Sequence, residues 1–139
     1  MLYDETVARV YDGHFQRPVD RWEDERLVRL LRPHVNGRTV IDVGCGTGWT
    51  LDHLAVYDYL GVDASRQMLA RLIEKHPGRK VRLLEVGSPE WDQYVMSQCR
   101  AFDVAVSTWA AHDLGDLGRL VAQLAHVAPT VILHGQGPR

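Results

Sequence analysis

The chain is 139 residues long, 45% hydrophobic and 24% charged, with a formal net charge of −2 at neutral pH. Such a length and composition predict one globular domain with an ordinary hydrophobic core. The small net charge argues against general affinity for nucleic acid or anionic membranes, and no apolar run is long enough to span a bilayer. We therefore expect neither nucleic acid nor a membrane as a partner.

The N-terminus and the cysteine content indicate the compartment. The first residues lack the basic and then apolar pattern of a secretion signal. The two cysteines, Cys45 and Cys99, do not make a disulfide framework, so both are expected to be free thiols. These features predict a reducing, cytoplasmic location.

The first part of the chain predicts two helices before any strand. Apolar residues recur at helical spacing near the N-terminus, and a second helical run follows Pro18 and ends near Pro33. We expect residues 1–35 to form cover or lid helices of a single domain that spans residues 1–139.

Five apolar strands then alternate with four amphipathic helices. The strands are expected over residues 39–43, 59–63, 81–86, 102–107 and 130–134. The helices between them are expected to begin near Thr47, at Ser65, at Pro89 and before Leu117. This alternation predicts an α/β fold: a Rossmann-like, doubly wound parallel sheet of strand order 3-2-1-4-5 with helices on both faces.

A glycine-rich loop follows the first strand directly and carries Gly44, Gly46 and Gly48. Glycine lets the backbone turn tightly and approach a ligand closely, and the next helix points free N–H groups at that ligand. About 20 residues after Asp42 the second strand ends at Asp63, where an acid can take ribose hydroxyls. This order of elements predicts a nucleoside-binding crevice.

Ligands of such sheets bind outside the carboxyl ends of the strands, at the point where the strand order reverses. For the expected order this point lies between the first and fourth strands, beside the glycine loop. The polar or glycine residues that fall at or near these strand ends are Asp42, Gly44, Asp63, Ser88 and Ser107.

The pattern hydrophobic-Asp-hydrophobic-Gly-x-Gly-x-Gly, from Ile41 to Gly48, resembles the first motif of class I S-adenosylmethionine-dependent methyltransferases. The resemblance implies S-adenosylmethionine as cofactor, with the glycine loop near its methionine part and Asp63 on both ribose hydroxyls. The predicted cofactor-binding residues are Tyr11, Asp42, Gly44, Cys45, Gly46, Gly48, Asp63, Ala64, Ser88 and Ser107.

Two further segments resemble this family. The Tyr-Asp pairs near the N-terminus resemble a lid helix, which implies that Tyr11, or else Tyr3, reaches the methionine carboxylate. Residues 102–116 resemble the fourth strand and the segment after it. Within that segment His112 is the best candidate base, and Asp113 either orients it or replaces it. A purely structural role for His112 stays open, and His14 and His53 are weaker candidates.

The chain departs from the family pattern in its adenine contact and at its C-terminus. Ser88 lies where members often carry an Asp that binds the adenine amino group; it offers a hydrogen bond but no charged acceptor. Strands 6 and 7 of the family are missing after residue 134. The apolar edge left at residues 131–133 predicts a homodimer formed through the fifth strand.

The leading hypothesis is methyl transfer to a small-molecule or other O or N acceptor. The segment after the fourth strand lacks the motifs of DNA base methylation, the basic stretch over residues 66–82 is interpreted as a solvated helix face, and no cluster has metal-ligand spacing. One alternative is a catalytically idle S-adenosylmethionine-binding domain that regulates or joins a larger assembly. The other is an NAD-dependent oxidoreductase, against which Asp42 and the glycine spacing argue.

Overall fold

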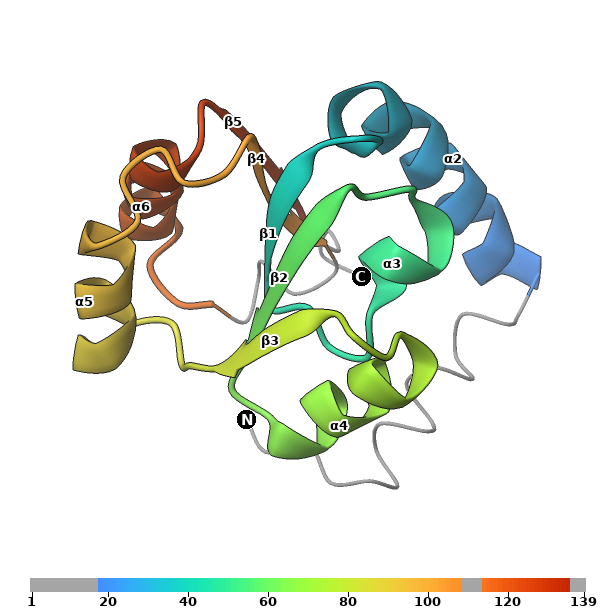
Figure 1. Cartoon of the computed structure of the whole chain (residues 1–139). Coiled ribbons are helices and arrows are strands. Elements are labelled where there is room, and N and C mark those ends of the chain that lie inside the picture. The colour runs from blue at the N-terminus through green and yellow to red at the C-terminus, as the bar shows by residue number, and fades with distance from the viewer. Residues whose placement is uncertain (1–17, 109–113, 136–139) are drawn as a thin grey trace.

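The computed structural model describes residues 18–108 and 114–135, and these residues form a parallel sheet covered by helices (Figure 1). The strands are β1 (Thr39–Val43), β2 (Asp58–Asp63), β3 (Lys80–Leu83), β4 (Val104–Thr108) and β5 (Thr130–His134). The helices are α2 (Pro18–Val35), α3 (Trp49–His53), α4 (Arg66–Lys75), α5 (Pro89–Met96) and α6 (Leu117–Val127). The sheet order is β3-β2-β1-β4-β5, which confirms the predicted fold class.

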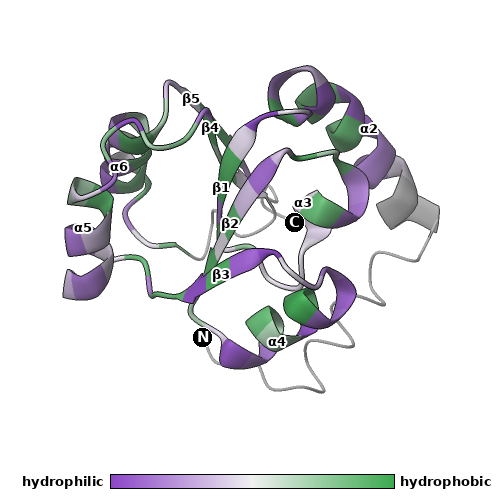
Figure 2. Ribbon diagram, in the orientation of Figure 1, coloured by the Kyte–Doolittle hydropathy of each residue, from purple (hydrophilic) through white to green (hydrophobic). Residues whose placement is uncertain are grey.

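The two faces of the sheet carry separate halves of the core. Helices α5 and α6 lie on one side and α2, α3 and α4 on the other (Figure 1), and apolar residues of each helix face the sheet (Figure 2). Strand β1 lies between them and is almost wholly buried. Its Val40 packs in the cluster under α2, whereas Ile41 packs in the cluster under α5 and α6, as expected when successive side chains point to opposite faces.

Helix α2 is part of this core. Its residues Leu27, Leu31 and Val35 are buried and belong to the same apolar cluster as Val40 and Tyr59 of the sheet. Among the described residues, no helix is both long and apolar enough to cross a membrane.

Element boundaries agree with the sequence for β1 and β5 and differ for β3 and β4. Strand β3 stops at Leu83 because the next residues turn toward α5, with Ser88 N–H donating to Glu85 O. Strand β4 starts at Val104; before it, Phe102 N–H donates to Val127 O, at the end of α6, and Asp103 N–H donates to Thr39 O at the start of β1. Helix α3 begins after Gly48 rather than Thr47, and no side chain caps it.

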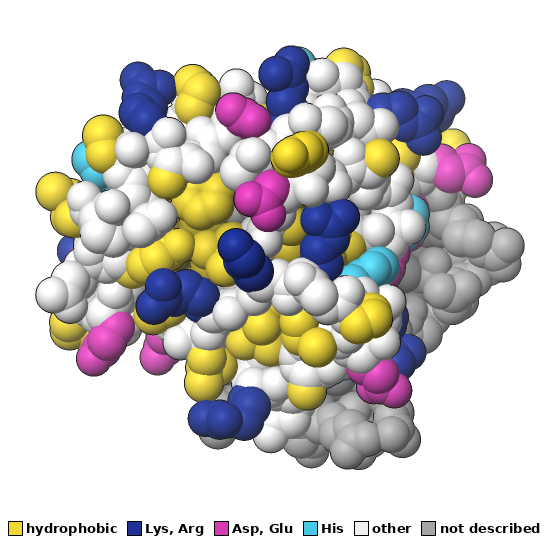
Figure 3. Space-filling model, in the orientation of Figure 1, with side chains coloured by type: hydrophobic (Ala, Val, Ile, Leu, Met, Phe, Trp, Pro, Cys, Tyr) yellow, Lys and Arg dark blue, Asp and Glu magenta, His cyan; other side chains and the backbone are white. Residues whose placement is uncertain are grey.

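The basic residues of the stretch 66–82 contact different parts of the protein. Lys75 pairs with Asp52, Arg79 donates to the carbonyls of Val56 and Tyr57, and the Arg82 guanidinium lies over the Tyr94 ring. Lysine and arginine side chains are spread over the face seen in Figure 3, with acidic and hydrophobic side chains between them.

Candidate functional site

The glycine loop takes a backbone course that requires glycine. Gly44, Gly46 and Gly48 have φ values of 70°, 55° and 99°, a region that other residues seldom adopt. The N–H groups of Gly44 and Cys45 both donate to Val62 O, at 2.7 and 3.0 Å, and Gly48 N–H donates to Cys45 O at 3.1 Å. The loop is therefore tied to the end of β2 by its own backbone.

Asp63 lies at the end of β2 and connects this strand to the loop. Its Oδ2 accepts a hydrogen bond from Gly46 N–H and its Oδ1 accepts one from Ser65 N–H, both at 2.9 Å. Burial raises the pKa of Asp63 above its ordinary value, although these N–H donors act in the opposite direction. Because each carboxylate oxygen has two lone pairs, both oxygens keep the capacity to accept a ligand hydroxyl. The structure thus brings Asp63 and the glycine loop together.

Asp42 lies below the loop instead of at its surface. The side chain is 1% exposed, and the Tyr59 hydroxyl donates to its Oδ2 at 2.7 Å. Burial raises the pKa of Asp42 to about 6, against the opposing effects of the Tyr59 and Thr50 hydroxyls. Asp42 Oδ1 and Thr50 Oγ1 are buried and lack hydrogen-bonding geometry to any other group in the described part of the chain. The Asp42 side chain is therefore buried in the protein interior beside Tyr59. Its contact with a cofactor stays a prediction.

Cys45 turns its thiol toward β2. The residue is buried, and burial raises the pKa of its thiol, so the sulfur stays neutral. A Cβ at Gly61 would lie 2.9 Å from Cys45 Sγ and 3.0 Å from the Tyr59 ring. Gly61 therefore makes room for the two side chains under the loop. The sequence analysis missed Gly61, although a glycine inside an apolar strand often marks such a close approach.

The two predicted serines, one after β3 and one near the end of β4, differ in their contacts. Ser88 caps α5, with its Oγ accepting from Trp91 N–H at 3.1 Å, and its hydroxyl proton is left to donate. Ser107 lies in β4, which is buried along its whole length, and its Oγ is buried without a hydrogen-bond partner among the described residues. Trp91 is fully buried and donates to Gln123 Oε1 at 2.8 Å, so it belongs to the core.

Several predicted residues lie outside the described part of the chain. These are Tyr3, Tyr11, His14, His112 and Asp113. Ala64 is described and is exposed directly after Asp63. Within the described ranges, no group of three His, Cys, Asp or Glu side chains is arranged to hold a metal ion.

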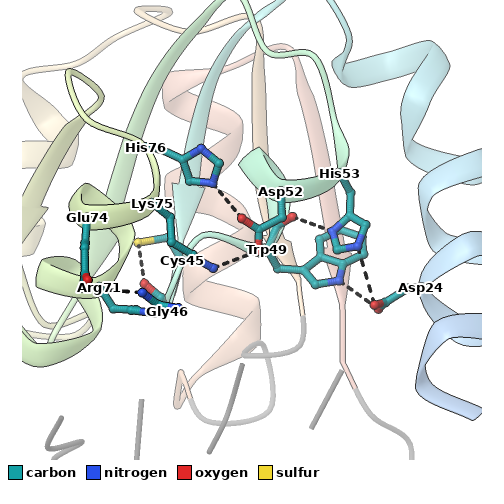
Figure 4. Close-up of polar contacts among 10 residues, drawn as sticks. All are labelled: Asp24, Cys45, Gly46, Trp49, Asp52, His53, Arg71, Glu74, Lys75 and His76. Atoms are coloured by element: carbon teal, nitrogen blue, oxygen red, sulfur yellow. Dashed lines mark hydrogen bonds and ion pairs between the residues drawn. The ribbon is translucent and has the colours of Figure 1, made fainter. Parts of the chain in front are cut away.

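A second set of contacts fixes the far end of the glycine loop (Figure 4). The Trp49 indole N–H donates to Asp24 Oδ1 of α2 at 2.8 Å, and His53 Nδ1 donates to Trp49 O at 2.9 Å. Asp52, on the same short helix, instead contacts Lys75, the last residue of α4, and His76, its C-cap, at 2.9 and 2.7 Å. The sequence analysis did not single out Asp24 or Trp49, because nothing local relates residues 25 positions apart.

The chain matches known proteins in sequence and in fold. A family model described as a methyltransferase domain matches residues 41–129. No curated protein sequence matches the chain. An S-adenosylmethionine-dependent methyltransferase from Mesorhizobium loti is 28% identical, with a TM-score of 0.58 over 74% of this chain and 47% of that one.

Two more distant structures share the fold. A Haloferax volcanii protein in a complex with the Trm112 methyltransferase activator is 18% identical, with a TM-score of 0.67 over 89% of this chain and 53% of that one. A Haemonchus contortus phospholethanolamine N-methyltransferase 2 bound to S-adenosylhomocysteine is 17% identical, with a TM-score of 0.66 over 91% of this chain and 31% of that one. The chain thus spans about half, or less, of each of these three structures. From the matched domain, the sheet order and the glycine loop, the chain belongs to the class I S-adenosylmethionine-dependent methyltransferases.

Proposed function

We propose that the protein transfers the methyl group of S-adenosylmethionine to an oxygen or nitrogen atom of a small molecule. The observation that carries this proposal is the junction of Asp63 with the glycine loop. Gly46 N–H and Ser65 N–H hold one carboxylate oxygen each, and the remaining lone pairs suit the two adjacent hydroxyls of a ribose.

The hydrogen bonding of the loop fits a cofactor without phosphate. The N–H groups of Gly44, Cys45, Gly46 and Gly48 are bonded within the protein, to Val62 O, Asp63 or Cys45 O. A dinucleotide needs free N–H groups at a helix N-terminus for its pyrophosphate, and α3 has only five residues. These contacts favour a sulfonium nucleoside over NAD.

When bound, the cofactor supplies the electrophilic methyl group, so the protein mainly binds and orients the reactants and excludes water. Asp63 would hold the ribose and the loop backbone the methionine part. The buried hydroxyl of Ser107 offers a further hydrogen bond at the adjoining strand end. We keep His112 and Asp113 as the proposed base and its partner, since an O or N acceptor that carries a proton must lose it.

The proposal is tested by calorimetric titration with S-adenosylmethionine and S-adenosylhomocysteine, and with NAD as control. We expect binding of the first two and none of NAD. The Asp63→Ala variant should lose about 1–3 kcal/mol of binding free energy, because a charged acceptor is removed. Asp103→Ala is the matched control: its carboxylate also accepts a backbone N–H, that of Thr39 at 2.9 Å, but at the opposite end of β1. Unchanged affinity in folded Asp63→Ala would remove the ribose assignment.

A second candidate is a domain that binds the cofactor without turning it over and acts within a larger assembly. The fold relative in complex with an activator protein supports a role within a larger assembly. Cofactor binding without methyl transfer to any tested acceptor would support it. For either role we propose a reducing, cytoplasmic location, consistent with the two free cysteines, Cys45 and Cys99.

A further inference from the structure

Asp24 is a buried carboxylate that serves no obvious packing need. It lies on α2, is 4% exposed, and reaches across to the first residue of α3, Trp49, which directly follows Gly48 (Figure 4). Burying a charge is unfavourable unless partners compensate it, and an apolar side chain would pack α2 on the sheet equally well. The partners of Asp24 therefore indicate what its carboxylate does.

His53 is the second of these partners. Its Nδ1 lies 2.9 Å from Trp49 O, a group that only accepts, so Nδ1 carries a proton. Its Nε2 lies 3.7 Å from Asp24 Oδ2, a contact that is attractive when Nε2 is protonated as well. The ring also stacks on the Trp49 indole, with centroids 4.7 Å apart. Asp24 and His53 together hold both the side chain and the carbonyl of Trp49.

The glycine loop is thus held from two directions. On one side, β2 binds it through Val62 O and Asp63. On the other side, α2 binds the residue that follows its last glycine. Three glycines at positive φ give the loop a wide choice of backbone conformations when nothing restrains it. The α2 contact lies outside the matched domain, which starts at residue 41, so the motif alone does not contain it.

We propose that Asp24 is a positioning residue of the cofactor site: through Trp49 and His53 it keeps the C-terminal end of the glycine loop in the arrangement that binds S-adenosylmethionine. The inference rests on the proposed function, since it requires the cofactor to bind at this loop. Holding a loop in its bound conformation raises affinity because less of the binding energy is used to order it.

The test is a double-mutant cycle on cofactor affinity, measured by calorimetry, with the melting temperature of each variant recorded separately. Asp24→Ala and Trp49→Phe should each weaken S-adenosylmethionine binding about tenfold, which is the size of one hydrogen bond to a charged group. The double variant should bind no more weakly than either single variant, because both remove the same contact. Asp24→Asn should restore most of the affinity, since its side-chain oxygen still accepts from the indole.

Asp92→Ala is the matched control on the opposite face of the sheet. Asp92 joins α5 to α6 through Arg119 at 2.6 Å and Gln123 at 2.8 Å. Its loss should lower the melting temperature and leave the dissociation constant unchanged. If Asp24→Ala does not fold, Trp49→Phe and Asp24→Asn still decide the question.

Three results would overturn the positioning role. One is an unchanged dissociation constant in folded Asp24→Ala and Trp49→Phe, and another is additive losses in the double variant. The third, no binding of S-adenosylmethionine by the unmodified protein, would overturn the proposed function as well.

Discussion

Asp42 and Asp63 end neighbouring strands, yet they do different things. Asp63 faces the loop and bonds two backbone N–H groups, whereas Asp42 is enclosed with Tyr59 below it. The sequence predicted the place of Asp63 because strand, loop and acid follow one another locally. It could not predict that Asp42 is covered, or that Asp24 supports Trp49, because both depend on contacts between distant parts of the chain.

The raised pKa of Asp42 makes stability depend on pH. Its pKa is about 6 in the folded protein against an ordinary 3.8, so the folded state holds this proton more tightly. The contribution is fully present below pH 3.8 and is lost as pH rises through 6. An Asn side chain does not titrate, so Asp42→Asn should remove this loss. The free energy of unfolding of the variant, relative to that of the unmodified protein, should therefore rise by up to about 3 kcal/mol between acid and neutral pH.

Urea unfolding of both proteins below pH 3.8 and above pH 6 measures this gain. Tyr59→Phe is an informative companion, because it removes the hydrogen bond to Asp42 and keeps the carboxylate. A difference between Asp42→Asn and the unmodified protein that does not vary with pH would contradict the argument.

At the scale of elements, the sequence placed β1 and β5 at their observed bounds, because both are short, mainly apolar runs with turn residues on each side. It extended β3 too far and began β4 too early, since the apolar residues Leu84, Val86 and Phe102 pack against the core beyond the strand ends. The cap of α4 was also predicted: Ser65 Oγ accepts from Met68 N–H at 3.2 Å. The local capping pattern of α4 was therefore predicted better from the sequence than the ends of β3 and β4.

Ser88 has two separable roles, one in the helix and one predicted at the adenine. Ser88→Ala should lower the free energy of unfolding by about 1 kcal/mol through loss of the α5 cap. Ser88→Asp keeps a capping oxygen at a helix N-terminus and so should not destabilise the protein. It should also tighten S-adenosylmethionine binding, because it supplies the charged acceptor that the family often carries. Thermal melts report the first role and calorimetry the second; equal affinities in all three proteins would exclude an adenine contact.

At the scale of the whole molecule, the parallel sheet with helices on both faces followed from the alternation of strands with helices, since parallel strands need crossover connections. The acceptor pocket could not be foreseen in the same way. The residues expected to shape it, His112 and Asp113, lie outside the described ranges, and the chain covers only 47%, 53% and 31% of the three similar structures.

Self-association through β5 stays a prediction at this scale. Strand β5 is the outer strand of the described sheet beside β4, and its Val131, Ile132 and Leu133 are half-buried. An apolar outer strand favours pairing with another chain. Light scattering on the purified protein over a range of concentrations should give twice the monomer mass of 15.8 kDa. A monomer mass at all concentrations would contradict the dimer.

The packing of α2 has a practical consequence for fragment design. A fragment that begins at residue 41, where the matched methyltransferase domain starts, would keep the glycine motif and Asp63. It would lack Leu27, Leu31 and Val35, which pack against the sheet. The face carrying Tyr59 would then be open to water, and such surfaces promote aggregation. The smallest piece of this chain fit for expression is therefore expected to begin before α2, about one helix earlier than the motif suggests.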